Sequence, residues 1–359
     1  MNKTTEILFA TLRTALFGQP LPDGLFDGLK AEQWTELYRL AAKQGVLAIC
    51  YDVVSALPNE KQPPRNLNIQ WALGTKAIEN RYELQLKNSK VLAELFAEQN
   101  IRTLVMKGLA ISTYYPVSNH RECGDLDCFL GDDYEQGNVI CEQIGAKVKR
   151  DYYKNSHITY RGLMIENHRF CLPIRGNIGF KFLERHLEKV AVSDNPQYVA
   201  DTKLIIPTPD FNALFLTVHA LNHFLPEGIK LRHILDWALL LKAEQNNIDW
   251  ADFYNWTDRL HLTRFANALT AISVKYLGLQ ITNPNITTES EFTERVLDDV
   301  LVKSNSLFNK GYSPWKSRIK NVGNKFAFAW KYHKIYQKSV VIETLRSALA
   351  YFFDKKPKL

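Results

Sequence analysis

Three stretches of the chain differ in the spacing of their apolar residues. In residues 1–100 these positions recur at helical spacing, with a break at Pro20 to Gly24, because two prolines and a glycine cannot continue a helix. In residues 101–210 short apolar and alternating runs, typical of strands, are mixed with helical segments. From Pro207 onward the spacing is helical again. The pattern predicts an α+β fold with helical regions at 1–100 and 211–359 around a mixed core at 101–210.

The mixed core contains the elements that carry candidate chemistry. Its apolar and alternating runs predict strands at 102–106, 125–130, 146–151, 157–160 and 163–168, and helices at 108–115 and 133–145. We therefore expect a small mixed sheet with helices packed on it.

Two carboxylates open the second of these strands. Side chains alternate between the faces of a strand, so Asp125 and Asp127 point the same way, about 6.6 Å apart along the chain. At an effective dielectric near 20 their repulsion is about 2.5 kcal/mol, which a divalent cation would turn into attraction. Oxygen ligands of this type suit Mg²⁺. A solvated strand edge or a helix cap is the alternative interpretation of the bare Asp-x-Asp pattern.

Cationic and flexible residues lie near this pair. Lys107 ends the preceding apolar run, Gly108 allows close approach of backbone to a ligand, and Arg121 lies four residues before Asp125. Lysine and arginine hold phosphate oxygens. Lys107, Gly108 and Arg121 are therefore the candidate nucleotide-binding residues.

In combination these segments resemble a known family. Residues 106–110, 115–116 and 121–127 are similar to the core signature of the uncharacterised nucleotidyltransferase family, within the polymerase-beta-like nucleotidyltransferase superfamily. The resemblance continues through residues 34–46, 88–101, 165–168, 219–223 and 231–236, and covers roughly residues 30 to 245. Most of the wider superfamily has Gly-Ser or Gly-Gly at the first turn, where this chain has Lys107-Gly108-Leu109.

The resemblance implies a reaction and a cofactor. A nucleoside monophosphate would pass from a nucleoside triphosphate, ATP among the candidates, to a hydroxyl acceptor with release of pyrophosphate, assisted by one or two Mg²⁺ ions. The acceptor classes are a small molecule, a sugar, a protein or an RNA. In the place of the missing small residue, Lys107 would hold phosphate as a point charge.

A third carboxylate is needed, and Glu166 is the best candidate. Glu166 and His168 share one face of the strand at 163–168. If that strand lies beside the Asp125 strand, then Asp125, Asp127 and Glu166 converge as catalytic and metal-binding residues. Glu166 could also act as general base for the acceptor hydroxyl. The alternative for Glu166 is an ordinary exposed strand residue.

Further candidates lie in the C-terminal helical region. His219 and His223 are four residues apart on one helix face, without the acid of a zinc-protease motif between them. The resemblance places them near the cleft, so they are candidate acceptor-side residues, together with His168 and Arg232. Arg232 is also four residues from Asp236, and we expect these two to form an ion pair, with direct phosphate binding by Arg232 as the alternative.

Composition and cysteine usage set the outer limits. The chain has 359 residues of which 46% are hydrophobic, enough for two or three packed units, and no run reaches the 18 or so apolar residues of a membrane span. The five cysteines are odd in number and lack a Cys-x-x-Cys pair. These features predict a cytoplasmic protein with reduced thiols and no transmembrane segment.

Positive charge is concentrated at the C-terminus. Residues 301–359 contain thirteen lysines and arginines against two acids, a net charge of +11, so the remainder of the chain carries −4 of the total of +7. Aromatic residues are interleaved with these cations. The mixture is typical either of a surface for an anionic partner, such as nucleic acid, a membrane or a phosphorylated acceptor, or of basic helices with an aromatic core.

Three functions remain from the sequence. The first is a Mg²⁺-dependent nucleotidyltransferase. The second is a non-catalytic nucleotide- or nucleic-acid-binding protein that kept the fold, and the third is a phosphotransferase that moves the γ-phosphate. Clustered carboxylates repel one another and give a binding module no benefit, so the three acids favour the enzyme.

Overall fold

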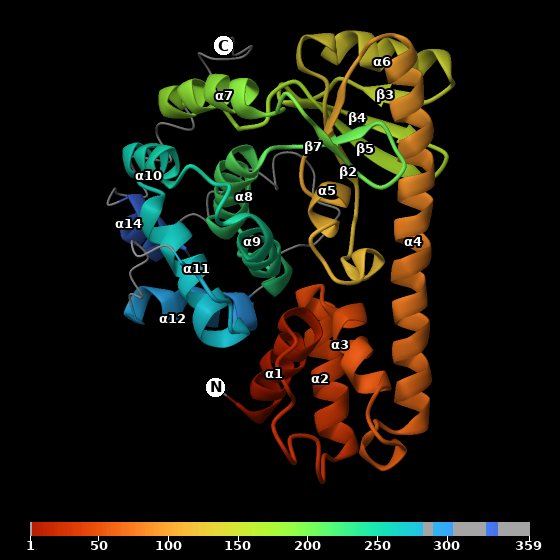
Figure 1. Cartoon of the computed structure of the whole chain (residues 1–359), viewed down its shortest axis with the longest axis vertical. Helices are drawn as coiled ribbons and strands as arrows, with labels where there is room; N and C mark the ends of the chain where they lie inside the picture. The colour runs from red at the N-terminus through yellow and green to blue at the C-terminus, as the bar shows by residue number, and fades with distance from the viewer. Residues whose placement is uncertain (1, 283–289, 304–327, 337–359) are drawn as a thin grey trace.

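The computed structural model of the protein describes residues 2–282, 290–303 and 328–336. Its N-terminal part is made of helices (Figure 1). The first three helices are α1 (Lys3–Phe17), α2 (Ala31–Gln44) and α3 (Leu47–Ser55). Helix α1 ends at Gly18, which adopts a left-handed conformation with φ 68°. The predicted break after the first helix is therefore confirmed.

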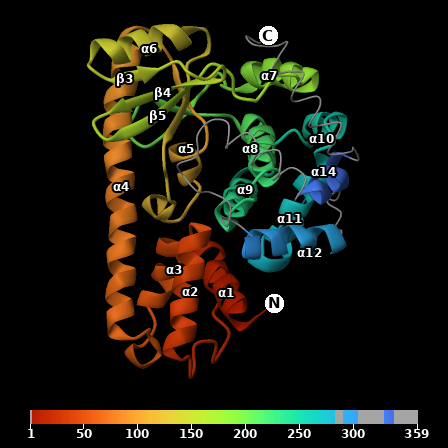
Figure 2. The same ribbon diagram turned by 180° about the vertical axis from the view of Figure 1, so that it is seen from behind.

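Helix α4 (Arg65–Glu98) is far longer than the segment at 88–101 indicated. Its 34 residues run beside both the N-terminal helices and the sheet (Figures 1 and 2). Its buried residues form one stripe with spacings of three, four and seven positions, at Trp71, Thr75, Tyr82, Gln85, Ser89, Leu92 and Phe96. This stripe explains why one helix can contact both parts.

A seven-stranded sheet forms the centre of the described chain. The strand order is β3-β4-β5-β2-β1-β7-β6, in which β2 pairs with β5 and β1 with β7 in parallel and the other pairs are antiparallel. The strands are β1 (Thr103–Val105), β2 (Leu126–Phe129), β3 (Lys147–Lys149), β4 (Asn155–Tyr160), β5 (Leu163–His168), β6 (Gln197–Tyr198) and β7 (Leu204–Ile206). The first five match predicted strands, whereas β6 and β7 were missed.

The two faces of the sheet contact different helices. Side chains of α4 and α6 (Tyr134–Gln143) form one buried cluster with Leu126, Cys128 and Ile165. Leu104 and Phe129 belong to the larger cluster on the other face, which includes helices of the C-terminal part. Because strand residues alternate, Asp127 and Glu166 point away from α4 and toward these C-terminal helices.

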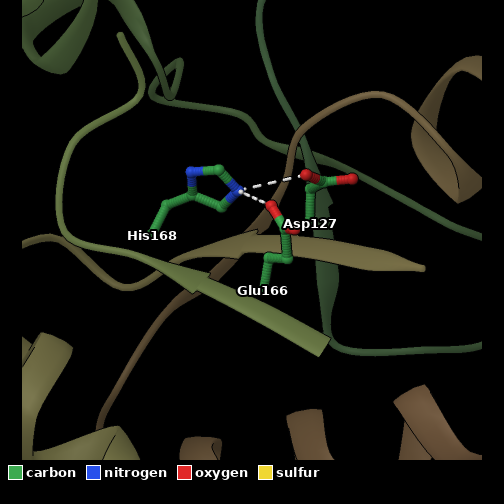
Figure 3. Close-up of side chains that lie close together, drawn as sticks. All are labelled: Asp127, Glu166 and His168. Atoms are coloured by element: carbon green, nitrogen blue, oxygen red, sulfur yellow. Dashed lines mark hydrogen bonds and ion pairs between the residues drawn. The ribbon is translucent and has the colours of Figure 1, made fainter. Parts of the chain in front are cut away.

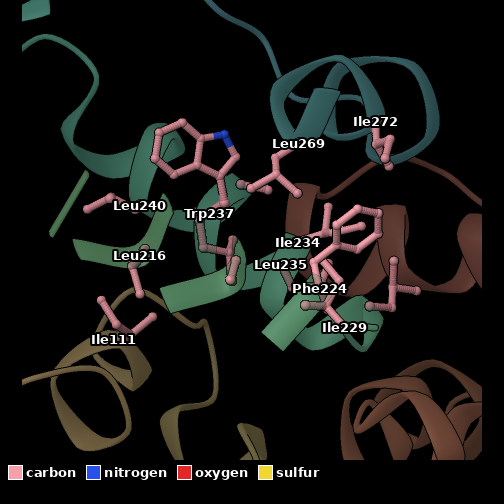
Figure 4. Close-up of a cluster of buried hydrophobic side chains, with 14 of the residues drawn as sticks. Ile111, Leu216, Phe224, Ile229, Ile234, Leu235, Trp237, Leu240, Leu269 and Ile272 are labelled. Carbon is pink, nitrogen blue, oxygen red and sulfur yellow. The ribbon is translucent and has the colours of Figure 1, made fainter. Parts of the chain in front are cut away.

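The C-terminal helices pack around a second apolar core (Figure 4). Trp237 is buried there beside Leu269, and its indole Nε1 donates to Thr270 Oγ1 at 2.9 Å. The remaining helices are α5 (Leu109–Ser112), α7 (Ile178–Val190), α8 (Pro209–Phe224), α9 (Leu231–Glu244), α10 (Trp250–Arg259), α11 (Thr263–Leu277), α12 (Ser290–Asp298) and α14 (Ala329–Tyr336). The mixed sheet with helical flanks confirms the predicted α+β class.

The basic C-terminal region at 301–359 lies largely outside the described residues. In its described part, Lys331 of α14 is buried and its Nζ lies 2.6 Å from Asp299 Oδ2 and 2.7 Å from the Phe224 carbonyl oxygen. This lysine therefore contributes to packing rather than to a solvated face. Within the ranges described, no helix combines the length and the apolar character needed to cross a membrane.

Candidate active site

Pairing of β2 with β5 brings the acidic residues together. Asp127 is the direct neighbour of Glu166 in this parallel pair, and Phe129 is the neighbour of His168. Alternation along β5 places Glu166 and His168 on the same face as Asp127. The strand adjacency on which the third-carboxylate hypothesis depended is therefore present.

His168 links the two carboxylates (Figure 3). Its Nε2 lies 3.0 Å from Asp127 Oδ1 and 3.4 Å from Glu166 Oε2, and its Nδ1 lies 3.3 Å from the Phe170 carbonyl oxygen. One ligand atom from each of the three side chains lies within 4.8 Å of the others. Asp127 and His168 are buried, whereas the Glu166 side chain is 31% exposed. Glu166 is therefore the member of the cluster that a substrate can reach.

The turn after β1 places a cation on Asp127. Lys107 Nζ lies 3.0 Å from Asp127 Oδ2. Lys107 has a φ of 56°, and Gly108 follows with φ 50° and ψ −117°, a combination that only glycine adopts without strain. This explains why glycine follows the lysine that reaches back to the acidic cluster.

Neighbouring charges and burial shift the pKa values of the three carboxylates in different directions. Burial alone would raise the pKa of Asp127, but the Lys107 ammonium and the hydrogen bond from His168 lower it to about 2. The hydrogen bond from His168 also lowers the pKa of Glu166. Burial and repulsion by Asp127 raise the pKa of Asp125, which lies just before β2 and outside the close cluster. Asp127 is thus held ionised, as a metal ligand must be.

Two cavities meet at these residues. The first, which we call the α9 chamber, has a volume of about 350 Å³, and the second, the β4 chamber, about 480 Å³. Lys107, Asp125, Asp127, His219 and His223 line both. Arg121, Lys230 and Arg232 line only the α9 chamber, and Lys154, Glu166 and His168 line only the β4 chamber. Asp125 and Asp127 therefore lie where the two chambers join, and Glu166 faces the β4 chamber alone.

A larger cavity of about 1010 Å³ lies elsewhere, toward the carboxyl end of β2. Phe129, Gly131 and Arg169 are among its lining residues, but none of the clustered acids is. Size alone therefore does not identify the site, and the chemistry lies in the two smaller chambers.

Comparison with known protein families agrees with this geometry. Residues 30–278 match a family described as an uncharacterised nucleotidyltransferase. The chain belongs to this uncharacterised nucleotidyltransferase family. Searches of curated proteins and of solved structures returned no match. The matched range of the nucleotidyltransferase contains every candidate site residue named from the sequence.

One predicted contact of this nucleotidyltransferase is wrong. Asp236 does not pair with Arg232 but with Arg121, whose Nη2 lies 2.7 Å from Asp236 Oδ2 and whose Nε lies 3.1 Å from Oδ1. The Tyr115 hydroxyl donates to the same carboxylate at 2.7 Å. Arg232 instead donates to the Glu122 carbonyl oxygen at 2.7 Å. Folding brings the loop before β2 onto α9, so the long-range partner replaces the local one.

The Arg121 guanidinium is buried and makes its contacts within the protein. Its Nη1 also contacts the Glu122 carbonyl oxygen at 3.2 Å and Cys123 Sγ at 3.3 Å, and Arg121 is 5% exposed. Although Arg121 lines the α9 chamber, its donors are engaged in joining the site loop to α9.

The histidines of α8, His219 and His223, line both chambers. The ring centroids of His219 and His223 are 4.7 Å apart, and His233 of α9 lies 6.0 Å from the first and 5.8 Å from the second. His223 Nδ1 lies 2.5 Å from Glu227 Oε1. Burial holds the pKa values of His219 and His233 well below the ordinary value, so these two rings are neutral.

Three cleft residues were not singled out from the sequence. His233 lies inside the 231–236 segment that resembles the family, and this could have drawn attention to it. Lys230 precedes that segment, and Lys154 precedes β4, where an isolated lysine carries no recognisable signal. Only their placement along the chambers distinguishes them from surface lysines.

Proposed function

We propose that this protein is a Mg²⁺-dependent nucleotidyltransferase that transfers a nucleoside monophosphate from a nucleoside triphosphate to a hydroxyl acceptor. The observation that carries the proposal is the cluster of Asp127, Glu166 and His168, of which Asp127 lies at the junction of the two chambers together with Asp125 and Lys107. The junction would bring two substrates together on the carboxylates.

The donor set fits a divalent cation. Asp127 Oδ2 is buried and, among the described residues, accepts no hydrogen bond of good geometry, although Lys107 lies near it as a counter-charge. Asp125, Asp127 and Glu166 provide oxygen ligands, which Mg²⁺ prefers. We assign His168 the task of orienting Asp127 and Glu166 through its Nε2–H. These residues would hold the ion, which supplies charge that draws electrons from the α-phosphate.

The residues of the chain would then perform the transfer. The acceptor oxygen forms a bond to the α-phosphorus, and the bond from that phosphorus to the bridging oxygen breaks, so that pyrophosphate leaves with the electron pair. Glu166, the exposed carboxylate of the cluster, would accept the proton of the attacking hydroxyl. Lys107 would offset negative charge on the phosphates once the ion has taken its place beside Asp127.

We assign the nucleotide phosphates to the α9 chamber and the acceptor to the β4 chamber. The α9 chamber contains Gly108, which permits close approach, together with Lys230 and Arg232. Arg232 Nε is buried and has no hydrogen-bond partner among the described residues, so it is free to donate a hydrogen bond to a phosphate oxygen. Glu166, the proposed base, lines only the β4 chamber. Arg121 would position the loop and α9 rather than bind phosphate directly.

The basic region at 301–359 remains a candidate surface for an anionic partner, on the strength of its net charge of +11. We expect truncation after Tyr351, which removes three lysines, to weaken binding of such a partner in a salt-dependent way. Fluorescence anisotropy with a labelled single-stranded RNA at increasing salt measures this effect. Equal affinity of the full and truncated chains at every salt concentration would argue against a role for those residues.

Thermal melting with each of four nucleoside triphosphates, with and without Mg²⁺, tests the proposed function. We expect a Mg²⁺-dependent rise in melting temperature, because a ligand that binds only the folded state stabilises it. Asp127→Asn should lose this rise, whereas Asp201→Asn, an exposed control, should keep it. Labelled products then separate the reactions, since α-labelled phosphate reaches the acceptor in nucleotidyl transfer and γ-labelled phosphate in a phosphotransferase. No shift with any triphosphate would favour a non-catalytic member.

A further inference from the structure

Lys154 differs from three other cations of the described residues in its lack of a carboxylate partner. Lys107, Arg121 and Lys331 each lie within 3.0 Å of a carboxylate oxygen. Lys154 lines the β4 chamber and is partly buried, yet no carboxylate of the described ranges lies within ion-pair distance of its Nζ. An ammonium partly removed from water without a counter-ion is unfavourable. Within the described residues, the chamber thus contains a charge without a carboxylate partner.

The backbone holds Lys154 in place. Its carbonyl oxygen accepts from the amide of Arg169 at 2.7 Å and from that of Phe170 at 3.1 Å. These residues directly follow His168, so the start of β4 is tied to the end of β5 beside the acidic cluster. The position of Lys154 relative to Glu166 is therefore set by the sheet and not by a free loop.

A second donor beside Lys154 also lacks a partner in the part of the chain that the structure describes. Asn155 is 3% exposed, lines the same chamber, and its Nδ2 makes no hydrogen bond to any described residue. Buried amide donors are normally satisfied. Two adjacent residues with unused donors favour a ligand that brings oxygen acceptors and negative charge.

The surrounding charges agree with such a ligand. Burial and the proximity of Lys107 lower the pKa of Lys154, as expected for a cation that lacks its counter-charge. His157 lies 3.1 Å from Asp151 and 3.7 Å from Glu166, so it is occupied with carboxylates and does not compete for an anion. Asp125, Asp127 and Glu166 would repel an anion until a divalent cation neutralises them. Anion binding should therefore depend on Mg²⁺.

We propose that Lys154 and Asn155 bind an oxyanion, a phosphate or carboxylate group, carried by the acceptor, so that the acceptor is a small anionic hydroxyl compound. This inference rests on the proposed function and adds the class of its second substrate. A volume of about 480 Å³ is within the range of small-molecule sites. Glu166 lies in the same chamber, so one molecule can place its anionic group on Lys154 and its hydroxyl near the base.

The same chemistry could come from a phosphate of the nucleotide, and the test must separate the two sources. The protein is loaded with Mg²⁺ and an α,β-methylene triphosphate analogue that cannot react, and inorganic phosphate is titrated in by calorimetry. We expect phosphate to bind alongside the analogue. Lys154→Met should weaken phosphate at least tenfold and change the affinity for the analogue less than twofold. Lys203→Met, an exposed control, should change neither.

A structural role for Lys154 predicts different results. Because its ammonium has no carboxylate partner among the described residues, Lys154→Met should melt at the same temperature as the wild type or higher, and a large fall would overturn the proposal. Competition between phosphate and the analogue, an equal loss of both in Lys154→Met, or no phosphate binding would also overturn it. If the wild type does not bind the analogue, the proposed function is overturned. The acceptor assignment, which rests on it, is then overturned as well, even if phosphate binding that depends on Lys154 persists.

Discussion

Asp127 and Glu166 lie directly opposite each other on two parallel strands, with His168 Nε2 within 3.4 Å of both carboxylates. Leu126 and Cys128 of β2 and Ile165 of β5 face the cluster that contains α4, whereas Asp127 and Glu166 face the other side of the sheet. The cluster is therefore a consequence of strand pairing, and its members can be tested separately.

Replacing His168 should weaken metal binding without removing a carboxylate. His168→Gln loses the donor that orients Asp127 and Glu166, and loss of such a supporting contact typically costs about 10- to 100-fold in metal affinity. Mg²⁺ titrations followed by melting in the presence of nucleotide measure this change. His157→Gln is the matched control, because His157 approaches Glu166 at 3.7 Å on its other side. Unchanged Mg²⁺ affinity together with lost Mn²⁺ affinity would instead make His168 a direct ligand.

Replacing Glu166 should separate binding from turnover. In Glu166→Gln, Asp125 and Asp127 remain to hold the ion and the triphosphate, so most of the nucleotide-induced rise in melting temperature should persist. Loss of the proton acceptor should slow pyrophosphate release by about 100-fold or more. Glu98→Gln on the exposed side of α4 serves as control. Turnover equal to that of the wild type would remove Glu166 from the role of base.

The buried ion pair between Arg121 and Asp236 should be strongly coupled. These residues are 5% and 4% exposed, and Arg121→Met leaves a buried carboxylate unpaired, which costs about 3 to 5 kcal/mol. Adding Asp236→Leu removes that uncompensated charge, so the double variant should be more stable than Arg121→Met alone. Urea unfolding of the wild type, both single variants and the double variant gives the coupling energy. Additive losses would mean that the pair is not coupled.

His120 should make stability depend on pH. Burial alone would lower its pKa, but contacts from its two ring nitrogens to Asp52 at 3.0 Å and to Glu79 at 3.1 Å raise it above the ordinary value of 6.5. A raised histidine pKa gives stability that is fully present below pH 6.5 and lost as the pH rises through the folded-state value. Melting temperatures of the wild type should exceed those of His120→Asn most at low pH.

The difference between the two proteins, measured from pH 5.5 to 8.5, isolates this histidine from other titrating groups. The gap in melting temperature should narrow as the pH rises. A gap that stays constant would show that His120 contributes through packing and not through its charge. The effect concerns the attachment of the loop before Arg121 to α3 and α4, since Asp52 and Glu79 belong to these helices.

Local sequence patterns determined where most helices and strands form and on which face of a strand a site residue lies. Alternation in 163–168 was enough to place Glu166 with His168 on one face, because a strand has a period of two whatever surrounds it. Asp125, predicted to share a face with Asp127, instead lies just before β2 and outside the close cluster. The five predicted strands formed, and the first helix ended at Gly18, just before the predicted break. The short β6 and β7 escaped detection, since two or three residues do not establish a period.

Contacts between distant segments were decided only by the tertiary structure. Spacing of four favoured Arg232 as the partner of Asp236, but the folded chain brings Arg121 to that carboxylate, and two nitrogens of one guanidinium bind it better than a flexible surface pair does. From the sequence, the position of Glu166 beside Asp127 was a hypothesis. The parallel pairing of β2 with β5 makes these two residues direct neighbours. Lys154 has no signature in the local sequence, because its lack of a carboxylate partner among the described residues depends on what surrounds it in the fold and not on its neighbours in the chain.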